Sequence, residues 1–198
     1  MRSPFRLPNV SQAAAPTLET ERLLLRHVRP SDINYFASTH ADEEVMRHVG
    51  GPVSREDAWR RALTGAGFWG VLGIGLWAVE RRSDGQTIGH VGFFDFQRDM
   101  DPSIAGEPEM GWIFSPDGQG KGFATEAAQT ALKWFDAAIG AVSIPAIIDL
   151  GNTPSMKLAE RIGFIRQADA IYRDAPIAVY RRSSPLHGGT ASRSAGPG

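Results

Sequence analysis

The sequence contains no cysteine, which excludes disulfides, thiolate metal sites and catalysis by a cysteine nucleophile. It also lacks an excess of positive charge, because 21 Lys and Arg residues stand against 22 Asp and Glu residues, and a basic footprint for nucleic acid is missing. No apolar run reaches the roughly 18 residues of a membrane span, and residues 1–16 hold no apolar block typical of a signal peptide. These absences favour a cytoplasmic protein with no nucleic acid and no membrane among its partners.

The 198 residues are 42% hydrophobic and 22% charged, which is typical of one soluble globular domain. Residues 1–17 are rich in Pro, Ser and Ala and are predicted to form a flexible N-terminal segment. Residues 184–198 hold mostly Gly, Ser and Pro and are predicted to form a disordered tail. The single domain is therefore expected at residues 18–183, either as a monomer or as a homodimer.

Hydrophobic periodicity and turn residues predict six strands and four helices in the order β-α-α-β-β-β-α-β-α-β. The strands are expected at residues 21–28, 76–80, 87–96, 109–114, 144–150 and 177–181. The helices are expected at residues 31–41, at residues 54–64, after the glycines near residue 122, and from residue 153 towards residue 163. This order predicts an α/β (α+β) fold in which helices cover a mixed sheet.

One glycine-rich segment matches the consensus of a dinucleotide-binding motif but lacks the structural context that the motif needs. Residues 65–70 fit G-x-G-x-x-G, but the dinucleotide fingerprint needs a strand before it and a helix after it. Here a predicted helix precedes the segment and a predicted strand follows it. We therefore expect a flexible connection at residues 65–70.

The segment from Pro116 to Ala127 is the most informative part of the sequence, because a glycine-rich turn there joins a strand to a helix. Small residues let the backbone approach a ligand, and free N–H groups at a helix N-terminus attract anions. A Walker loop is excluded because Lys121 is followed by glycine, and the Rossmann frames place Phe123 or Thr125 where the third glycine belongs. Two interpretations of the turn alone stay open: a phosphate cradle and a plain glycine-rich connection.

The spacing Gln119-x-x-Gly122-x-Ala124 resembles the [Q/R]-x-x-G-x-[G/A] signature of the GNAT superfamily of acyl-CoA-dependent N-acetyltransferases. The block at residues 152–164 resembles the N-x-x-S-x-x-L-x-x-x-x-G-F segment of the same family. Residues 18–26 are similar to the opening of the branch that contains ribosomal-protein N-terminal acetyltransferases. The resemblance implies a mostly antiparallel, twisted sheet of about six to seven strands, flanked by about four helices and splayed between the fourth and fifth strands.

The resemblance also implies acetyl-CoA as the co-substrate and no metal. It places the CoA pyrophosphate on the N–H groups of residues 119–124, where backbone donors add to the helix dipole. It implies a bulge in the strand at residues 109–114 that frees backbone groups for pantetheine, with an N–H near Ile113 polarising the thioester carbonyl. The residues implied in binding acetyl-CoA are Trp112, Ile113, Phe114, Gln119, Gly120, Lys121, Gly122, Phe123, Ala124, Thr125, Asn152 and Ser155. For Lys121 a solvated loop lysine is the alternative.

The attacking amine must lose a proton, so the reaction needs a base or a water chain. Glu109, at the start of the splayed strand, is the expected base, and Glu107 is the second candidate; a solvated carboxylate is the alternative for either. The family often uses a tyrosine to protonate the departing thiolate, but residues 153–164 contain none, and Ser155 takes that place by motif. For Asn152 and Ser155, helix capping is an alternative that is compatible with these roles.

These features predict an N-acetyltransferase that moves an acetyl group from acetyl-CoA to a primary amine, either a protein or peptide N-terminus or a small-molecule amine. Without cysteine, the amine is expected to attack directly in a ternary complex. The missing tyrosine leaves one alternative, a non-catalytic acyl-CoA-binding or sensory domain on the same fold. Acceptor residues are expected from the first two helices and from a loop at residues 68–75.

Overall fold

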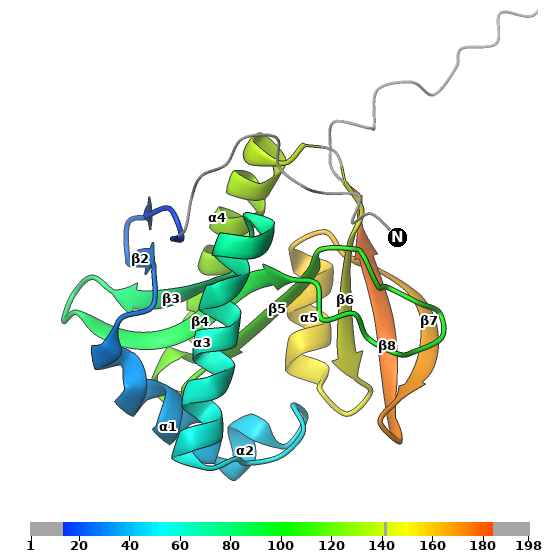
Figure 1. The fold of residues 1–198 in the computed structure, drawn as a ribbon, viewed down its shortest axis with the longest axis horizontal. Coiled ribbons are helices and arrows are strands. Elements are labelled where there is room, and N and C mark those ends of the chain that lie inside the picture. Colours follow the sequence, from blue (N-terminus) through cyan, green and yellow to red (C-terminus); the bar gives the residue numbers. More distant parts are fainter. Residues whose placement is uncertain (1–13, 141, 184–198) are drawn as a thin grey trace, which may run out of the picture.

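The computed structural model describes residues 14–140 and 142–183 of the chain (Figure 1). The strands are β1 (Leu18–Glu19), β2 (Leu23–Arg26), β3 (Leu76–Arg81), β4 (Gln86–Phe94), β5 (Glu109–Phe114), β6 (Ile144–Asp149), β7 (Ile165–Tyr172) and β8 (Ala175–Arg182). The α-helices are α1 (Ile33–Ala41), α2 (Glu43–Met46), α3 (Arg55–Leu72), α4 (Phe123–Ala138) and α5 (Thr153–Arg161). Two short 3-10 helices are η1 (Pro30–Asp32) and η2 (Pro116–Gly118).

The strands form two antiparallel sheets where one mixed sheet was expected. The first sheet has the order β1-β2-β3-β4-β5 and the second the order β6-β8-β7, so no ladder joins β5 to β6 in the described chain. The predicted α/β fold and its splay between the strands at residues 109–114 and 144–150 are therefore confirmed. The predictions missed β1 and β7, because β1 has two residues and β7 exposes most of its side chains, so neither shows the apolar alternation of a typical strand.

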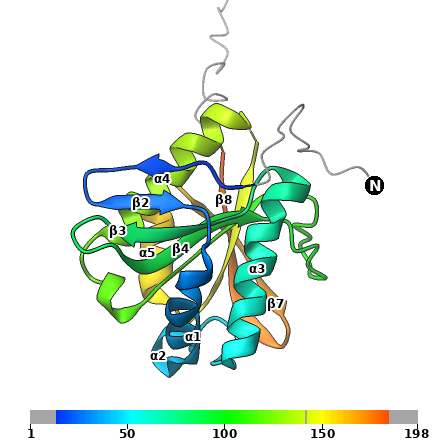
Figure 2. The same ribbon diagram turned by 60° about the vertical axis from the view of Figure 1, so that its left-hand side comes forward.

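Helices cover both faces of the five-stranded sheet. α3 crosses in front of it beside α1, and α5 lies behind it (Figures 1 and 2). The larger core, on the side of α4 and α5, packs Phe93 against Phe135 with ring centroids 4.5 Å apart. A smaller core under α1 and α3 includes Phe36 and Phe94.

Helix α3 continues through the glycine-rich segment at residues 65–70, so the flexible connection predicted there is wrong. Gly65 permits close packing, because an added Cβ would lie 2.8 Å from Leu76 Cδ1. Trp69 is buried and donates its indole N–H to the Leu76 carbonyl at 3.0 Å, which fixes the last turns of the helix. The helix ends at Gly73, whose φ of +70° belongs to the left-handed region. Tertiary packing thus outweighs the low helix propensity of glycine.

Gly67→Ala tests this helix and is expected to raise the free energy of unfolding by about 0.5–1 kcal/mol, since alanine loses less backbone entropy than glycine in a helix. An added Cβ at Gly67 meets no atom within 4 Å. Gly65→Ala is the control, and its clash with Leu76 is expected to cancel or reverse the gain. Urea unfolding followed by tryptophan fluorescence measures both variants. A destabilised Gly67→Ala protein would contradict a helical segment here.

The described start of the chain is anchored to the domain. The Ala15 N–H donates to His27 Nδ1 at 3.2 Å, and the Trp77 indole N–H donates to the Pro16 carbonyl at 2.7 Å. Residues 15 and 16 are therefore held in place, although they fall in the segment predicted to be flexible. The remainder of that segment, residues 1–13, and the predicted tail at residues 184–198 lie outside the described residues.

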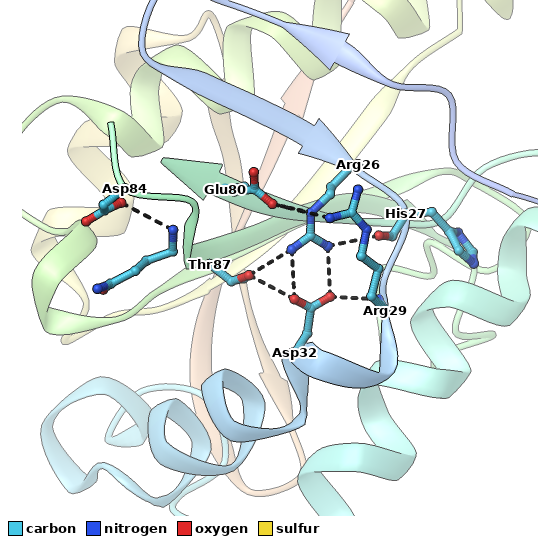
Figure 3. Close-up of polar contacts among 8 residues, drawn as sticks. Arg26, His27, Arg29, Asp32, Glu80, Asp84 and Thr87 are labelled. Atoms are coloured by element: carbon cyan, nitrogen blue, oxygen red, sulfur yellow. Dashed lines mark hydrogen bonds and ion pairs between the residues drawn. The ribbon is translucent and has the colours of Figure 1, made fainter. Parts of the chain in front are cut away.

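A buried ion pair fastens β2 to the start of α1 (Figure 3). Arg26 donates from both terminal nitrogens to Asp32, each at 2.9 Å, and from Nε to Glu80 at 2.6 Å. Asp32 also accepts from the backbone N–H of Arg29 at 2.7 Å and from the Thr87 hydroxyl at 2.9 Å. Although burial acts to raise it, these hydrogen bonds hold the pKa of Asp32 below its ordinary value. The network ties β2, β3 and β4 to the helix that borders the site.

Candidate functional site

The glycine-rich turn lies between β5 and α4, where the sequence predicted it. Gly120 and Gly122 have φ values of +72° and +79°, in the left-handed region that favours glycine. Gly122 is the N-cap of α4 and has no side chain to satisfy the first N–H groups of that helix. The positive end of a 16-residue helix is therefore left open to a ligand.

The free N–H groups begin one residue later than the resemblance implied. The N–H of Gln119 donates to the Pro116 carbonyl at 3.2 Å, and its side-chain amide donates to the Phe114 carbonyl at 2.9 Å. Gln119 therefore shapes the turn from inside, and its backbone N–H is not a free donor. For the N–H groups of residues 120–125, no backbone acceptor is recorded in the described part of the chain. These six groups are the donors that the turn offers to an anion.

Residues from the β1–β2 hairpin hold the turn in place. Arg22 donates to the Lys121 carbonyl at 3.0 Å and to Glu126 Oε2 at 2.7 Å, and its guanidinium lies over the Phe123 ring. Thr20 donates its hydroxyl to the same carboxylate at 2.5 Å. Although partial burial acts to raise it, these donors keep the pKa of Glu126 below its ordinary value. Sequence reasoning missed this contact, although Thr20 and Arg22 lie in the first block that carried the resemblance.

An open groove of about 590 Å³ runs beside the turn. It is lined by Thr20, Arg22, Gly122, Thr125, Glu126, Gln129, Thr130, Lys133 and Arg161. Lys133 comes from α4 and Arg161 from α5, so two helices bring cationic side chains to one groove. An anionic ligand that extends from the turn would meet further positive charge there.

The register of β5 decides which backbone groups face the gap towards β6. In an antiparallel pair, opposed residues alternate between pairs that exchange both hydrogen bonds and pairs that exchange none. His90 lies opposite Ile113. Two residues further on, the Ser115 N–H donates to the Ile88 carbonyl at 3.0 Å, which places Ile113 in the hydrogen-bonded set. The backbone groups of Ile113 therefore point to β4.

The neighbours of Ile113 present the groups that face the gap. By the same alternation, Trp112 and Phe114 direct their N–H and C=O groups towards β6. The Phe114 carbonyl accepts from the side-chain amide of Gln119. The groups left to face the gap are the Phe114 N–H and the N–H and C=O of Trp112. The β4–β5 pairing has no register shift, so the bulge that the resemblance implied is absent. The expected N–H near Ile113 is thus corrected to those of Trp112 and Phe114.

A partly exposed strip runs along β5 and β6 on the side of α1. Successive strand residues point to opposite faces. Met110 and Phe114 belong to the core under α4, so Gly111 and Ile113 point to the α1 side, and both are half-buried. On β6, Ile148 belongs to the same core, so its neighbours at positions 147 and 149 also point to the α1 side, and both are half-buried. Because the sequence predicts acceptor residues in the helix at residues 31–41, which is α1, we call this strip the acceptor face; it consists of Gly111, Ile113, Ile147 and Asp149.

Glu109 also lies on the α1 side, and its carboxylate is held by one arginine. Arg98 donates to the two oxygens at 2.6 and 2.8 Å, and 6% of Glu109 is exposed. Burial raises the pKa of Glu109 above its ordinary value, which suits a base, although the hydrogen bonds from Arg98 favour the ionised carboxylate. Glu107 is likewise paired, with Arg181 at 2.9 Å. Neither carboxylate is free in solvent, and the role of Glu109 as the base stays a prediction.

The block at residues 152–164 begins α5. Asn152 is the N-cap of this helix, and its side-chain oxygen accepts the Ser155 N–H at 3.1 Å, so the capping interpretation is confirmed for Asn152. Ser155 is half-buried in the first turn. Its hydroxyl has no hydrogen-bond partner recorded among the described residues, so it is available as a donor or an acceptor.

Within residues 14–140 and 142–183, no helix combines the length and the hydropathy of a membrane span. In the same residues, His, Asp and Glu side chains form no cluster of three or more that would hold a metal ion.

The family described as "Acetyltransferase (GNAT) domain" matches residues 22–165 of this chain. The uncharacterized N-acetyltransferase YoaA of Bacillus subtilis is 27% identical over 172 residues, which cover 86% of this chain and 92% of that protein. The structure of a putative GnaT-family acetyltransferase from Bordetella pertussis has a TM-score of 0.75 and 28% identity, covering 85% of this chain and 99% of that chain. Spermidine N-acetyltransferase from Vibrio cholerae, in complex with CoA and spermine, shares the fold with a TM-score of 0.65 and 18% identity, covering 83% of this chain and 97% of that chain.

Proposed function

This chain belongs to the GNAT acetyltransferase family, and we propose that it transfers an acetyl group from acetyl-CoA to a primary amine. The observation that carries the proposal is the turn before α4, where N–H groups without a backbone acceptor meet the positive end of the helix. Backbone donors in such a concave turn suit a diphosphate, because they bind negative charge without a counter-ion. The pyrophosphate of CoA is the diphosphate that the family supplies.

In this proposal the pyrophosphate binds the N–H groups of residues 120–125, which include Phe123 and Ala124. Lys121 donates to the Asp117 carbonyl at 3.2 Å, which keeps its ammonium group beside the turn as a further positive charge. The groove with Lys133 and Arg161 suits the phosphorylated nucleotide part of the co-substrate.

The pantetheine arm then lies in the gap between β5 and β6, where Trp112 and Phe114 offer backbone groups. An N–H of one of these two residues donates to the thioester oxygen and stabilises the oxyanion that forms during attack. Ser155, in the first turn of α5, is the proposed hydrogen-bond donor to the departing thiolate, and Asn152 holds that turn by capping it. Glu109, the base that the sequence predicts, is held in an ion pair with Arg98.

The amine approaches from the opposite side, across the acceptor face. Two contacts connect this face to the segments that precede α3: the Tyr35 hydroxyl donates to the Ile113 carbonyl at 3.3 Å, and His48 is hydrogen-bonded to Asp149. The two helices from which acceptor residues are predicted, at residues 31–41 and 54–64, correspond to α1 and α3. The loop predicted at residues 68–75 is helical as far as Leu72. Spermine in the Vibrio cholerae enzyme and the N-termini modified by the branch that the sequence resembles are both primary amines. We therefore propose an acceptor with a primary amine at the end of a flexible chain.

Two measurements test the function. Titration calorimetry is expected to show saturable binding of acetyl-CoA, and no binding at high micromolar concentration would refute the donor site. A thiol-release assay with polyamines, other small amines and short peptides is expected to show release that depends on the acceptor. Peptides with an acetylated N-terminus and no lysine are the control, because they offer no amine. Binding without thiol release for any acceptor would favour the non-catalytic acyl-CoA-binding domain.

A cytoplasmic location also stays a prediction. The choice between a monomer and a homodimer is open, and light scattering after size-exclusion chromatography decides it.

A further inference from the structure

His48 and Asp149 form a hydrogen-bonded pair at the border of the acceptor face. His48 Nδ1 lies 2.8 Å from Asp149 Oδ1, and the two side chains are 27% and 25% exposed. Asp149 is the last residue of β6, and His48 follows α2. In Figure 1 the loop after α2 reaches towards the turn between β6 and α5. The pair therefore joins a segment on the acceptor side to the start of the α5 block.

The backbone around Asp149 holds the pair in place. Asp149 Oδ1 also accepts the Gly151 N–H at 2.8 Å. Gly151 leaves room for the imidazole, because an added Cβ would lie 2.8 Å from His48 Cε1. The Asp149 carbonyl accepts the Asn152 N–H at 2.9 Å, and Asn152 caps the helix that carries Ser155. The imidazole is thus fixed beside the residues that the family motif associates with the co-substrate.

The hydrogen bond to Asp149 sets the tautomer of His48. An ionised carboxylate only accepts hydrogen bonds, so Nδ1 carries a proton, and the lone pair of the neutral imidazole is then on Nε2. No hydrogen bond to Nε2 is recorded within the described part of the chain, and the side chain is partly exposed. Next to His48 in the chain, Arg47 is paired with Glu44. From the elements packed against His48, Asp149 is the recorded charged partner. This is the arrangement of a general base that a carboxylate orients.

The other proton acceptors near the acceptor face are less suited to this role. Glu109 is buried in its arginine pair. His90 is buried, its Nδ1 lies 3.0 Å from the Tyr35 hydroxyl, and burial together with the nearby His40 lowers its pKa well below the ordinary value. His40 is buried as well, with its Nδ1 3.0 Å from the carbonyl of residue 36. Only the imidazole after α2 combines partial exposure with a carboxylate partner among these groups.

We propose that His48 is the general base of the acetyl transfer and that Asp149 is its positioning residue, an inference that rests on the proposed function. His48 Nε2 takes a proton from the ammonium form of the acceptor. The neutral amine attacks the thioester carbonyl carbon, so that the C–N bond forms and the C–S bond breaks. The second proton leaves the nitrogen for the departing thiolate, which yields the amide and the CoA thiol. His48 then releases its proton to solvent.

His48→Gln tests the proposal, because glutamine keeps a hydrogen-bonding side chain but cannot act as a base. We expect kcat/KM at pH 7 to fall by about 10²–10⁴-fold. The deficit relative to the wild type is expected to shrink as the pH approaches the pKa of the acceptor amine, since a neutral amine needs no base. Asp149→Asn is expected to give a smaller deficit with the same trend in pH. Acetyl-CoA affinity, measured by calorimetry, should stay within about twofold in both variants.

His27→Gln is the matched control, because His27 is also half-buried and hydrogen-bonded but lies after β2, away from the acceptor face. It is expected to leave the pH profile unchanged. Activity of His48→Gln within about twofold of the wild type would overturn the proposal, and so would a deficit of equal size at every pH. A pH-dependent deficit in Glu109→Gln in place of His48→Gln would assign the base to Glu109. A wild-type protein that releases no thiol with any amine would refute the proposed function itself.

Discussion

Asp32→Ala is expected to lower the free energy of unfolding by about 3 kcal/mol, because it removes the main partner of a buried guanidinium. The side chains of Arg26 and Asp32 are 5% and 3% exposed, so water has little access to the charge that remains. Breaking a buried pair costs about 3–5 kcal/mol, and we expect the lower end because Glu80 still accepts from Arg26 Nε at 2.6 Å. Urea unfolding at pH 7 measures the change.

The more exposed pair of Arg81 and Asp84, of which Asp84 is labelled in Figure 3, is the control; its side chains are 18% and 35% exposed. Its two residues lie three apart in the β3–β4 hairpin, and solvent screens their interaction. Asp84→Ala is therefore expected to leave the unfolding midpoint unchanged within the scatter of the measurement. A loss at Asp32→Ala that is no larger than the loss at Asp84→Ala would contradict the buried network.

The contribution of Asp32 also depends on pH. Its pKa in the folded protein lies below the ordinary value, so its stabilising effect is fully present above the unfolded pKa of about 3.9 and is lost as the pH falls through the folded pKa. The stability difference between the wild type and Asp32→Ala is therefore expected to shrink below about pH 4. Urea unfolding repeated between pH 7 and pH 3 measures this trend, and a difference that stays constant would contradict it.

Gly122→Asp is expected to weaken acetyl-CoA binding by at least about tenfold, because it places a negative charge against the expected pyrophosphate. Any side chain at this position is also strained. Gly122 has a φ of +79°, which strains any residue with a Cβ, and it borders the N–H groups of residues 123–125. A carboxylate there also competes for those N–H groups, as an N-cap side chain does. Calorimetric titration with acetyl-CoA measures the loss.

Two controls separate charge from strain. Gly122→Ala carries the strain without the charge, so it is expected to weaken binding less than Gly122→Asp. Gly140→Asp introduces both the charge and the strain at the far end of α4, where φ is +89° and no atom lies within 4 Å of an added Cβ. It is expected to leave the affinity for acetyl-CoA unchanged. Equal affinities for wild type and Gly122→Asp would place the pyrophosphate elsewhere.

The part of the site proposed to bind acetyl-CoA was predicted largely from local patterns in the sequence. The glycines at 120 and 122 mark left-handed positions at a strand–helix joint, and Asn152 followed by Pro154 marks the start of α5. Each of these signals depends on the conformation of a few consecutive residues, so it can be recognised without knowing what packs nearby. The strand at residues 109–114 was predicted for the same reason, whereas the gap beside it was implied by the resemblance to the family.

Longer-range features could not be predicted in this way. Helix α3 passes through several glycines because Trp69 and Leu76 pack and hydrogen-bond across its end, which outweighs local propensity. The register of β5 with β4 assigns the free backbone groups to Trp112 and Phe114, and a shift of one residue would reverse that assignment.

The chain by itself determined the family, the order of most of the elements and the turn that offers N–H groups to an anion, because these depend on short-range conformation. Tertiary structure alone decided which side chains meet at the site. Arg22 reaches Glu126 across 104 positions, and His48 reaches Asp149 across 101. Such contacts depend on how sheets and helices pack, since side chains far apart in sequence carry no local signal of one another. The acceptor half of the site is made of contacts of this kind.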